Sequence, residues 1–315
     1  MYNIVYSTSD MYAPFMATSL YTLLSNNDNL SDVIIHILSN DITEKNKNVI
    51  SKICEDYQAK CQYYDMQPII CDLKKRKAKL GFNPSSFIRI YLGEVLPEEV
   101  DRVLFIDSDT YVQNGIKELY ELDLQGKFIG MVYDQPIFSV FMNEAKLDDE
   151  IGCFNAGVML LDLKLWRENR IQGKLLDYFF EENRIFLAED QSVINAVLAP
   201  ETFVLDYKYN AMVYIFCWSY KKFCEMNYEI GKKTKEEFYE AQNKPVIIHF
   251  NGPSHVRPWE KWCSHPYTKK YRKALYAIYP DFVLRSGSTK QRKSFVVFQY
   301  FWHVIKDNIE KTINK

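Results

Sequence analysis

Short apolar runs alternate with helical patterns through the first half of the chain, and this alternation constrains the fold more than any other feature. The runs at residues 3–6, 33–38 and 102–106 are dominated by β-branched, aromatic and leucine residues. Apolar residues at helical spacing follow the first two runs, and Thr43 stands at the N-cap position of the second helix. Strands that are apolar on both faces and separated by helices are typical of an α/β fold. We therefore expect a mostly parallel central sheet flanked by helices.

Polar residues follow two of these runs directly. Residues 7–12 come after the first run, and Asp107-Ser108-Asp109 comes after the third. In open α/β sheets, ligands bind outside the carboxyl ends of the strands. Both segments are therefore expected at a binding crevice.

The composition excludes some classes of function. The 315 residues carry a net charge of −2, so no overall electrostatic attraction to nucleic acid is expected. Seven cysteines without a C-x-x-C pair favour reduced thiols over a zinc site or a disulfide framework. The N-terminus lacks the features of a secretory signal, and the longest apolar stretch, residues 295–305, is interrupted by Gln299 and His303. These features predict a cytoplasmic protein that does not span a membrane.

Asp107-Ser108-Asp109 carries the clearest chemistry. A D-x-D sequence at the end of an apolar strand places two carboxylates on a turn that faces the ligand crevice. Mg²⁺ and Mn²⁺ bind to carboxylates together with substrate phosphates, and the cation neutralises charge on a diphosphate leaving group. Acidic residues at strand ends are also common turn formers, so the three residues alone leave an ordinary turn open.

Four ordered segments surround and include this motif. They are residues 89–110, with VLFIDSDT, residues 154–166, with FNAGVMLLDL, residues 190–195, DQSVIN, and residues 249–259, with HFNG and RPW. Together they resemble the family 8 glycosyltransferases, which include bacterial lipopolysaccharide galactosyl- and glucosyltransferases and glycogenin. The resemblance extends from residue 1 to about residue 260. It implies a GT-A-like fold and retaining transfer of glucose or galactose from UDP to a hydroxyl group.

The resemblance also implies a metal site. Asp107, Asp109 and His249 match the family's Mn²⁺ ligands, with Mn²⁺ or Mg²⁺ as the cofactor. Imidazole is a reasonable third ligand for a first-row metal. Without the resemblance, a histidine at the end of an apolar strand is more often a hydrogen-bonded core residue.

Donor recognition is implied residue by residue. The 7–12 segment matches the nucleotide-binding loop, with Tyr12 stacking on uracil, although a simple strand-to-helix turn explains the same residues. Relatives often carry acidic or amide residues at Ser9 and Met11, and usually lysine at Arg257. Gly252 would allow close approach of the backbone to phosphate. The residues expected to bind the donor are Ser7, Thr8, Ser9, Tyr12, Arg89, Asp107, Ser108, Asp109, Asp134, Asn155, Gly252 and Arg257.

Asp190 and Gln191 are the candidate catalytic residues. Together with Asp134 and Asn155 they match sugar-contacting positions, and their short polar groups suit binding to sugar hydroxyls. A double displacement needs a nucleophile, for which Asp190 and Gln191 are the best-placed candidates. A front-face route needs no enzyme nucleophile, and the sequence does not choose between the two. Asp190 also suits the first turn of a helix for electrostatic reasons alone.

Two basic segments suggest a surface role. Residues 74–77 with Lys79 form a cationic run that is either a solvated surface, a segment near the donor or a contact for anionic lipid. The tail, residues 281–315, combines basic residues with aromatic and apolar side chains at helical spacing. Such a helix is typical of an interfacial membrane anchor, but it also suits packing on its own domain. We expect a transferase domain at residues 1–280 and a helical tail that associates with the inner face of the plasma membrane.

The sequence does not identify the acceptor, and three other functions are alternatives to sugar transfer to a glycan. A lipopolysaccharide, another cell-surface glycan or a glycolipid is the expected acceptor, with the aromatic residues 207–220 on its side of the site. Self- or protein glycosylation in the manner of glycogenin is one alternative. A nucleotidyltransferase would carry a glycine-rich basic loop, which YSTSDMYAPF does not supply. A catalytically inactive sugar-nucleotide-binding module has no need for a metal triad.

Overall fold

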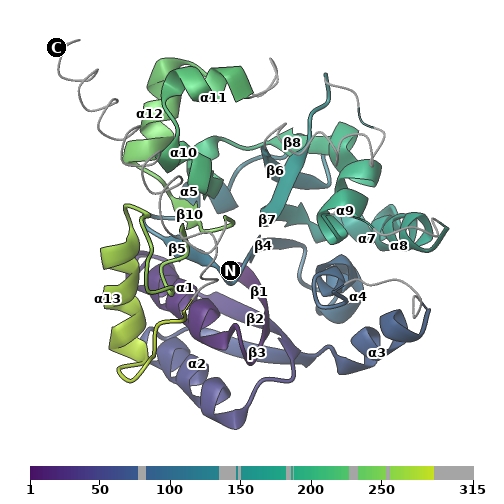
Figure 1. The fold of residues 1–315 in the computed structure, drawn as a ribbon. Coiled ribbons are helices and arrows are strands. Elements are labelled where there is room, and N and C mark those ends of the chain that lie inside the picture. The colour runs from purple at the N-terminus through teal and green to yellow at the C-terminus, as the bar shows by residue number, and fades with distance from the viewer. Residues whose placement is uncertain are drawn as a thin grey trace.

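The computed structural model describes residues 1–76, 83–134, 147, 150–181, 186, 188–226, 233–252 and 256–286. Its main sheet has seven strands in the order β3-β2-β1-β4-β7-β6-β8 (Figure 1). Neighbouring strands are parallel except at β7, which runs antiparallel to both β4 and β6. The mostly parallel sheet predicted from the apolar runs is confirmed. The strands are β1 (Tyr2–Ser9), β2 (Val33–Asn40), β3 (Lys60–Asp65), β4 (Arg102–Ile106), β6 (Ile129–Tyr133), β7 (Phe154–Asp162) and β8 (Thr202–Val204).

Burial follows the position of each strand in the sheet. The central strands β4 and β7 are buried along almost their whole length, and β1 is buried from Asn3 to Tyr6, which explains the apolar runs in these strands. The edge strand β3 has no fully buried residue, and its sequence KCQYYD is correspondingly polar. Its residue pattern is not that of a buried strand, so β3 is not recognisable from the sequence.

A second sheet joins distant parts of the chain. It has three strands in the order β5-β10-β9, namely β5 (Thr110–Val112), β10 (Ile247–His249) and β9 (Ala211–Met212). Strand β10 is antiparallel to β5, and His249 pairs with Thr110 in this register. The residue next to Asp109 is thereby held beside His249.

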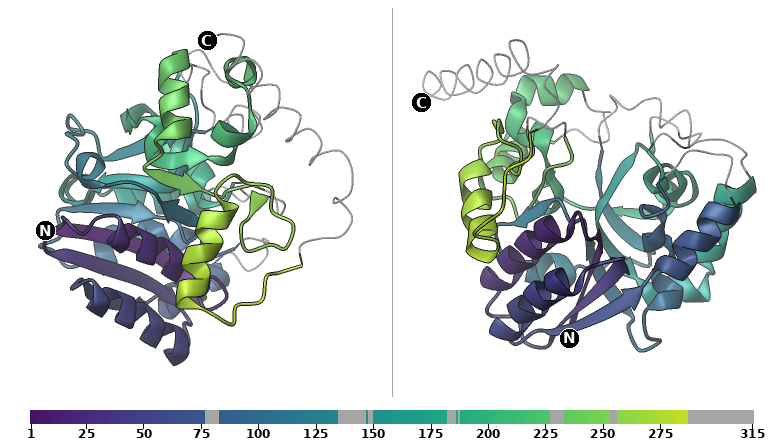
Figure 2. Two further views of the ribbon diagram at one scale, coloured as in Figure 1. Left: turned by 90° about the vertical axis from the view of Figure 1, so that its left-hand side faces the viewer. Right: turned by 60° about the horizontal axis from the view of Figure 1, so that its bottom comes forward.

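Helices form three groups around these sheets (Figures 1 and 2). The first group is α1 (Ala13–Ser25), α2 (Glu44–Asp56) and α13 (Thr268–Ile278), and α1 packs against both others. The second is α3 (Gln67–Arg76), η1 (Phe87–Tyr91), α4 (Leu92–Val95), α7 (Leu163–Glu168), α8 (Ile171–Glu181) and α9 (Asp190–Leu198). The third, beside the small sheet, is α10 (Val213–Cys217), α11 (Tyr220–Met226) and α12 (Lys235–Asn243). Short helices α5 (Lys117–Tyr120), η3 (Ala199–Glu201) and η4 (Tyr207–Asn210) complete the described elements.

The segment after the first apolar run differs from its prediction. Strand β1 continues to Ser9, because its pairing with β2 extends to Ser9 opposite Asn40. Only residues 10–12 form the turn into α1. Asp10 Oδ1 accepts hydrogen bonds from Thr43 N at 2.8 Å and Asn46 Nδ2 at 2.7 Å, which ties this turn to the start of α2. Thr43 is the N-cap of α2, as predicted, and accepts from Asn46 N.

The predicted tail lies mostly outside the described residues, as do Lys77 and Lys79 of the basic run. Phe282 meets Phe15 in an edge-to-face contact with ring centroids 5.9 Å apart. Arg285 N donates to Trp259 O at 2.9 Å, and Arg285 Nη2 donates to Met11 O at 2.8 Å. The boundary at residue 281 stays a prediction, but these contacts fasten the chain to the domain as far as Arg285.

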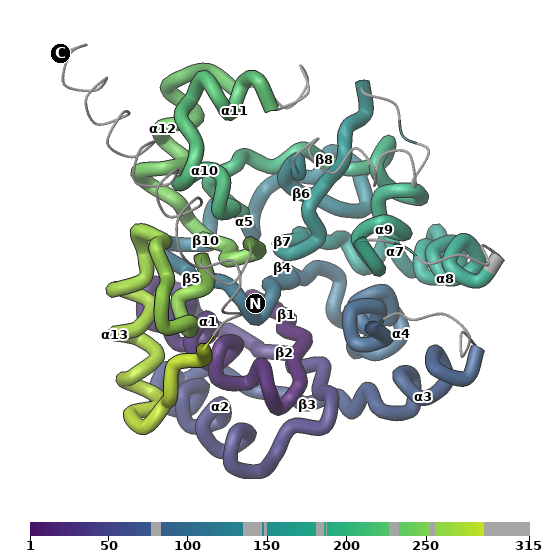
Figure 3. The backbone as a smooth tube through the Cα atoms, viewed as in Figure 1, coloured from purple at the N-terminus to yellow at the C-terminus, as the bar shows by residue number. Residues whose placement is uncertain are grey.

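Within the described residues, no helix has both the length and the apolar character required to cross a bilayer. The longest described helices, α1 and α2, have 13 residues each. The tube in Figure 3 shows β1 and β4 side by side at the middle of the molecule. The ends of these two strands position the site.

Candidate active site

Two cavities meet at the carboxyl ends of β1 and β4. The first has a volume of about 440 Å³ and the second about 340 Å³. Arg89, Asp107 and Asp109 line both cavities and form the junction between them. This is the position expected for a ligand site in an open α/β sheet.

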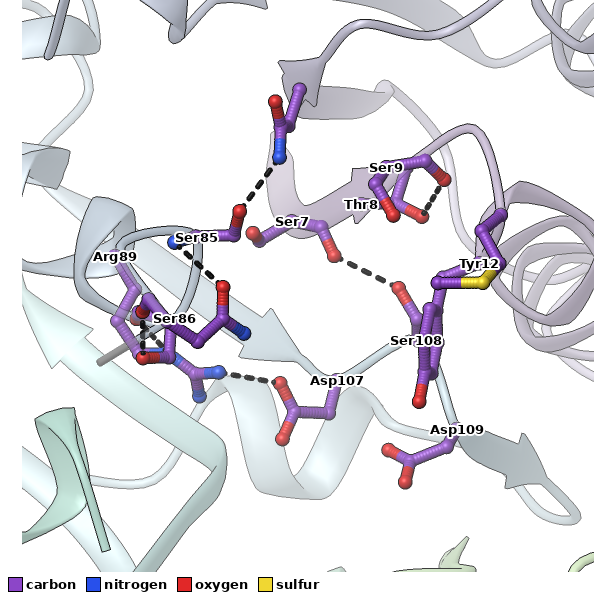
Figure 4. A pocket seen from close by; sticks show the side chains of 13 residues that line it. Ser7, Thr8, Ser9, Tyr12, Ser85, Ser86, Arg89, Asp107, Ser108 and Asp109 are labelled. Atoms are coloured by element: carbon purple, nitrogen blue, oxygen red, sulfur yellow. Dashed lines mark hydrogen bonds and ion pairs between the residues drawn. The ribbon is translucent and has the colours of Figure 1, made fainter. Parts of the chain in front are cut away.

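The first cavity contains the predicted nucleotide-binding residues (Figure 4). Tyr12 and Arg89 lie on opposite sides of it, with Asp107 between them. Besides the residues at the junction, it is lined by Ser7, Thr8, Ser9, Tyr12 and Ser108, all predicted, and by Met11, Asn40, Asn83, Ser85 and Ser86, which were not. Asn40 is the last residue of β2, so the rule that ligands bind at the carboxyl ends of strands could have identified it. The loop residues 83–86 carried no such signal.

The second cavity contains the predicted sugar-binding residues. Besides the residues at the junction, it is lined by Asp134, Asn155, Asp190, Gln191, His249 and Arg257, all predicted, and by Ala156, Gly157, Ala188 and Asn251, which were not. Gly252 lines neither of these two cavities. Its carbonyl accepts a hydrogen bond from Arg257 Nε at 2.9 Å, and an added Cβ would lie 2.5 Å from Val256 Cγ2. Within the described residues, Gly252 therefore allows close packing of its own segment.

Asp107, Asp109 and His249 come together at the junction. Asp109 Oδ1 lies 3.2 Å from His249 Nε2, and Asp107 Oδ2 lies 3.8 Å from the same nitrogen. One ligand atom from each residue lies within 4.8 Å of the others. Two carboxylate oxygens and an imidazole nitrogen suit a divalent first-row cation. The predicted triad is therefore assembled from the turn between β4 and β5 and from the end of β10, which are far apart in the sequence.

Two neighbours shape this group for a cation. Asn210 Oδ1 lies 3.1 Å from His249 Nδ1; because an amide oxygen can only accept, this contact places a proton on Nδ1. In the neutral ring, Nε2 then presents its lone pair to the two aspartates. Gly157 leaves the necessary space, since an added Cβ would overlap His249 Cε1 and lie 2.9 Å from Asp107 Oδ2. The residues present therefore fit a bound cation.

The charges of the triad are strongly coupled. Burial raises the pKa of Asp107, with Arg89 opposing and Asp109 reinforcing this effect. Burial also acts to raise the pKa of Asp109, but His249 and Arg257 outweigh it and hold that pKa below the usual value. For His249, burial acts to lower the pKa, yet the two aspartates raise it overall. A cation would bind the ionised carboxylates and the neutral imidazole, so cation binding would compete with protons for these three groups.

Arg89 links the two cavities. Its Nη2 donates to Asp107 Oδ1 at 2.9 Å, and its Nη1 donates to Ala156 O at 2.7 Å. Its Nε lies 2.9 Å from Asp190 Oδ2, although the Nε hydrogen is directed to Ser86 O at 3.3 Å. Burial raises the pKa of Asp190 to about 6 even though Arg89 opposes the shift. A guanidinium held in this way presents fixed positive charge at the junction.

Polar side chains on the sugar side bind one another. Asp134 Oδ2 accepts from Asn155 Nδ2 at 3.0 Å and from Gln191 Nε2 at 2.9 Å. Gln191 Oε1 accepts from Asn155 Nδ2 and from Ala156 N, both at 3.2 Å. Asp190 begins α9, directly after Glu189, whose φ of 51° is unusual for a residue other than glycine. The network holds its members in fixed orientations toward the second cavity.

Most aromatic side chains of the expected acceptor segment, residues 207–220, are buried, whereas Trp218 and Tyr220 are half-buried, and the role of the segment stays a prediction. Tyr207, Tyr209, Tyr214 and Phe216 are buried, and Tyr214 OH donates to Tyr133 O at 3.1 Å. Tyr207 and Tyr214 both contact the ring of Phe223 in α11, and η4, which contains Tyr207 and Tyr209, packs against α12. These buried side chains do not form an exposed surface for a glycan.

Comparisons with known proteins find a family, similar relatives and a similar fold. Residues 3–263 match the family described as Glycosyl transferase family 8. The chain is 24% identical over 272 residues to General stress protein A of Bacillus subtilis (strain 168), which covers 85% of this chain and 91% of the relative. It is also 24% identical over 300 residues to lipopolysaccharide 1,2-glucosyltransferase of Escherichia coli (strain K12), covering 94% and 83%. The crystal structure of galactosyltransferase LgtC with donor and acceptor sugar analogs has a similar fold, with a TM-score of 0.69, 19% identity and coverage of 92% of this chain and 99% of that one.

Proposed function

Because the chain belongs to glycosyltransferase family 8, we propose that it transfers glucose or galactose from a UDP-sugar to a hydroxyl of a glycan, with retention of configuration. One observation carries this proposal. Asp107, Asp109 and His249 lie together at the junction of a nucleotide-sized cavity and a second polar cavity. A donor diphosphate bound there would place its nucleoside in the first cavity and its sugar in the second.

The residues at the junction and in the first cavity have different roles in this proposal. Asp107, Asp109 and His249 would hold Mn²⁺ or Mg²⁺, which neutralises charge on the diphosphate as the sugar bond breaks. Arg257 lines the second cavity and faces Asp109, so its guanidinium is available to the same diphosphate. In the first cavity, Tyr12 would stack on uracil, while Ser7, Thr8 and Ser9 provide polar groups to the base and Ser108 fixes the turn through its bond to Ser7 O at 2.8 Å.

The sugar would be held by Asp134, Asn155, Asp190 and Gln191. In a double displacement, Asp190 or Gln191 would attack the anomeric carbon. In a front-face route, the leaving phosphate would take the proton of the acceptor hydroxyl, and the same two residues would orient the sugar. Of the two, Asp190 is the better nucleophile, because a carboxylate with a pKa of about 6 is more basic than an ordinary one and still ionised at neutral pH, whereas Gln191 offers only a neutral amide oxygen.

The acceptor is proposed to be a cell-surface glycan or glycolipid such as lipopolysaccharide. The similarity to a lipopolysaccharide 1,2-glucosyltransferase supports this class. Residues 285–315 contain seven Lys and Arg against Asp307 and Glu310, and Phe298, Phe301 and Trp302 stand among them. This tail is proposed to hold the enzyme at the inner, anionic face of the plasma membrane, where such an acceptor would be within reach.

UDP release from a panel of UDP-sugars tests the function. With Mn²⁺, slow hydrolysis of one donor is expected, and EDTA or Asp109→Asn should abolish it because both remove the cation from the diphosphate. Asp56→Asn is the matched control, since the Asp56 side chain lies on the surface of α2, where it forms an exposed ion pair with Lys52. Release that persists in EDTA would contradict metal-dependent transfer. No release from any donor, together with no binding of UDP, would contradict the proposed function itself.

A further inference from the structure

Asn210 is a buried amide that lies behind both halves of the site. It ends η4, has no exposed surface and lines neither described cavity. Its oxygen contacts His249 Nδ1 at 3.1 Å, and its Nδ2 donates to Asn155 Oδ1 at 2.9 Å. A single side chain therefore connects a residue of the cation site with a residue of the sugar pocket.

The polarity of these contacts fixes the orientation of both partners. Because the amide oxygen only accepts, it holds the proton of a neutral His249 on Nδ1 and leaves Nε2 for a cation. Asn155 Oδ1 accepts from Asn210 Nδ2 and also from Gly157 N at 3.0 Å. With its oxygen occupied, Asn155 must direct its Nδ2 to Asp134 and Gln191.

Asn195, another buried asparagine near the second cavity, is an example of a purely structural role. Asn195 in α9 also has no exposed surface, but its amide bonds to the backbone. It accepts from Phe154 N at 2.7 Å and donates to Phe154 O and Gln191 O, both at 2.8 Å. Asn210, in contrast, uses its amide on two side chains that face the cavities.

We infer that Asn210 is a positioning residue that couples the cation site to the sugar pocket. It sets the His249 ring for metal binding and the Asn155 amide for the donor sugar at the same time. The metal half of this inference rests on the geometry of the triad, and the sugar half rests on the proposed function. Hydrogen-bond partners behind metal ligands typically change metal affinity by about 10- to 100-fold when they are removed.

Three variants of the full chain separate the two halves. Mn²⁺ affinity is measured by isothermal titration calorimetry, and donor KM and kcat are measured by UDP release. Asn210→Ala should weaken Mn²⁺ binding by about 10- to 100-fold. Asn210→Asp can still accept from His249 Nδ1 but cannot donate to Asn155 Oδ1, so it should keep Mn²⁺ affinity within about threefold and lower donor kcat/KM by about tenfold or more. Asn195→Ala is the matched buried control and should leave Mn²⁺ affinity unchanged.

Two outcomes would overturn the inference: Asn210→Ala binding Mn²⁺ as tightly as the unmodified protein, or Asn210→Asp losing as much affinity as Asn210→Ala. If Asn210→Ala does not fold, Asn210→Asp alone decides, because a purely structural role predicts no split between metal affinity and donor turnover. Failure of the proposed function is recognised separately, since the unmodified protein would then bind Mn²⁺ and cleave no donor.

Discussion

Gly157 occupies a position in β7 where any side chain would enter the cation site. Its carbonyl accepts from Asp107 N at 2.8 Å, so its backbone also fixes the start of the D-x-D turn. An added Cβ would overlap His249 Cε1 and lie 2.7 Å from His249 Nδ1. The absence of a side chain at this one residue is thus a condition for the triad to form.

Replacing this glycine is expected to damage the metal site specifically. Gly157→Ala should weaken Mn²⁺ binding by about tenfold or more, because the His249 ring must move away from the aspartates. Gly173→Ala in α8 is the control, since nothing lies within 4 Å of its added Cβ and alanine favours a helix by about 0.5–1 kcal/mol. Calorimetric Mn²⁺ titration and thermal unfolding of both variants check this. Equal Mn²⁺ affinity in the two variants would contradict the role given to Gly157.

At the scale of single residues, the sequence predicts the metal-ligating side chains better than the residues that surround them. Asp107, Asp109 and His249 stand in recognisable segments, and the structure brings them together as predicted. The sequence did not predict a role for Asn210 or Gly157, because their roles depend on which side chains lie beside them in the folded protein. For Gly252, the structure adds a packing reason, since an added Cβ would lie 2.5 Å from Val256 Cγ2, and the role near phosphate stays a prediction.

At the scale of elements, strand pairing determines the site. Strand β10 carries His249 to Asp109 only because it pairs antiparallel with β5. The apolar run at residues 246–249 is typical of a strand, but a short apolar run does not specify which strand it pairs with. The reversed direction of β7 between β4 and β6 was likewise not predictable from local pattern, because a strand buried on both faces reads the same in either direction.

The proposed membrane binding of the tail, residues 281–315, can be tested by shortening the chain. A version ending at Ser286 keeps the contacts of Phe282 and Arg285 with the domain and should lose most binding to anionic vesicles. In the full chain, replacing Lys290, Arg292 and Lys293 with Gln should weaken this binding, whereas replacing Lys74 and Lys75 on α3 should not. Co-sedimentation with anionic and with neutral vesicles checks both statements. Equal sedimentation of the full and shortened chains would show that the tail does not bind the membrane.

At the scale of the whole molecule, the two halves of the sheet contribute different parts of one site. The ends of β1 and β4 line the first cavity, while β7, α9 and the end of β10 line much of the second. Arg89 bridges them through Asp107 and Ala156. That residues from these elements would form one site was predictable, because the four segments recognised in the sequence contain them. The sugar and the acceptor were not predictable, because they depend on cavity shape and on surfaces formed by distant segments.

The central claim is that a cation held by Asp107, Asp109 and His249 binds the donor diphosphate. UDP affinity measured by calorimetry, in Mn²⁺ and in EDTA, tests it most directly. We predict UDP binding about 5- to 150-fold tighter in Mn²⁺, as expected for two coupled ligands, and loss of this difference in His249→Ala. Equal UDP affinity in Mn²⁺ and EDTA, or an unchanged difference in His249→Ala, would contradict the account.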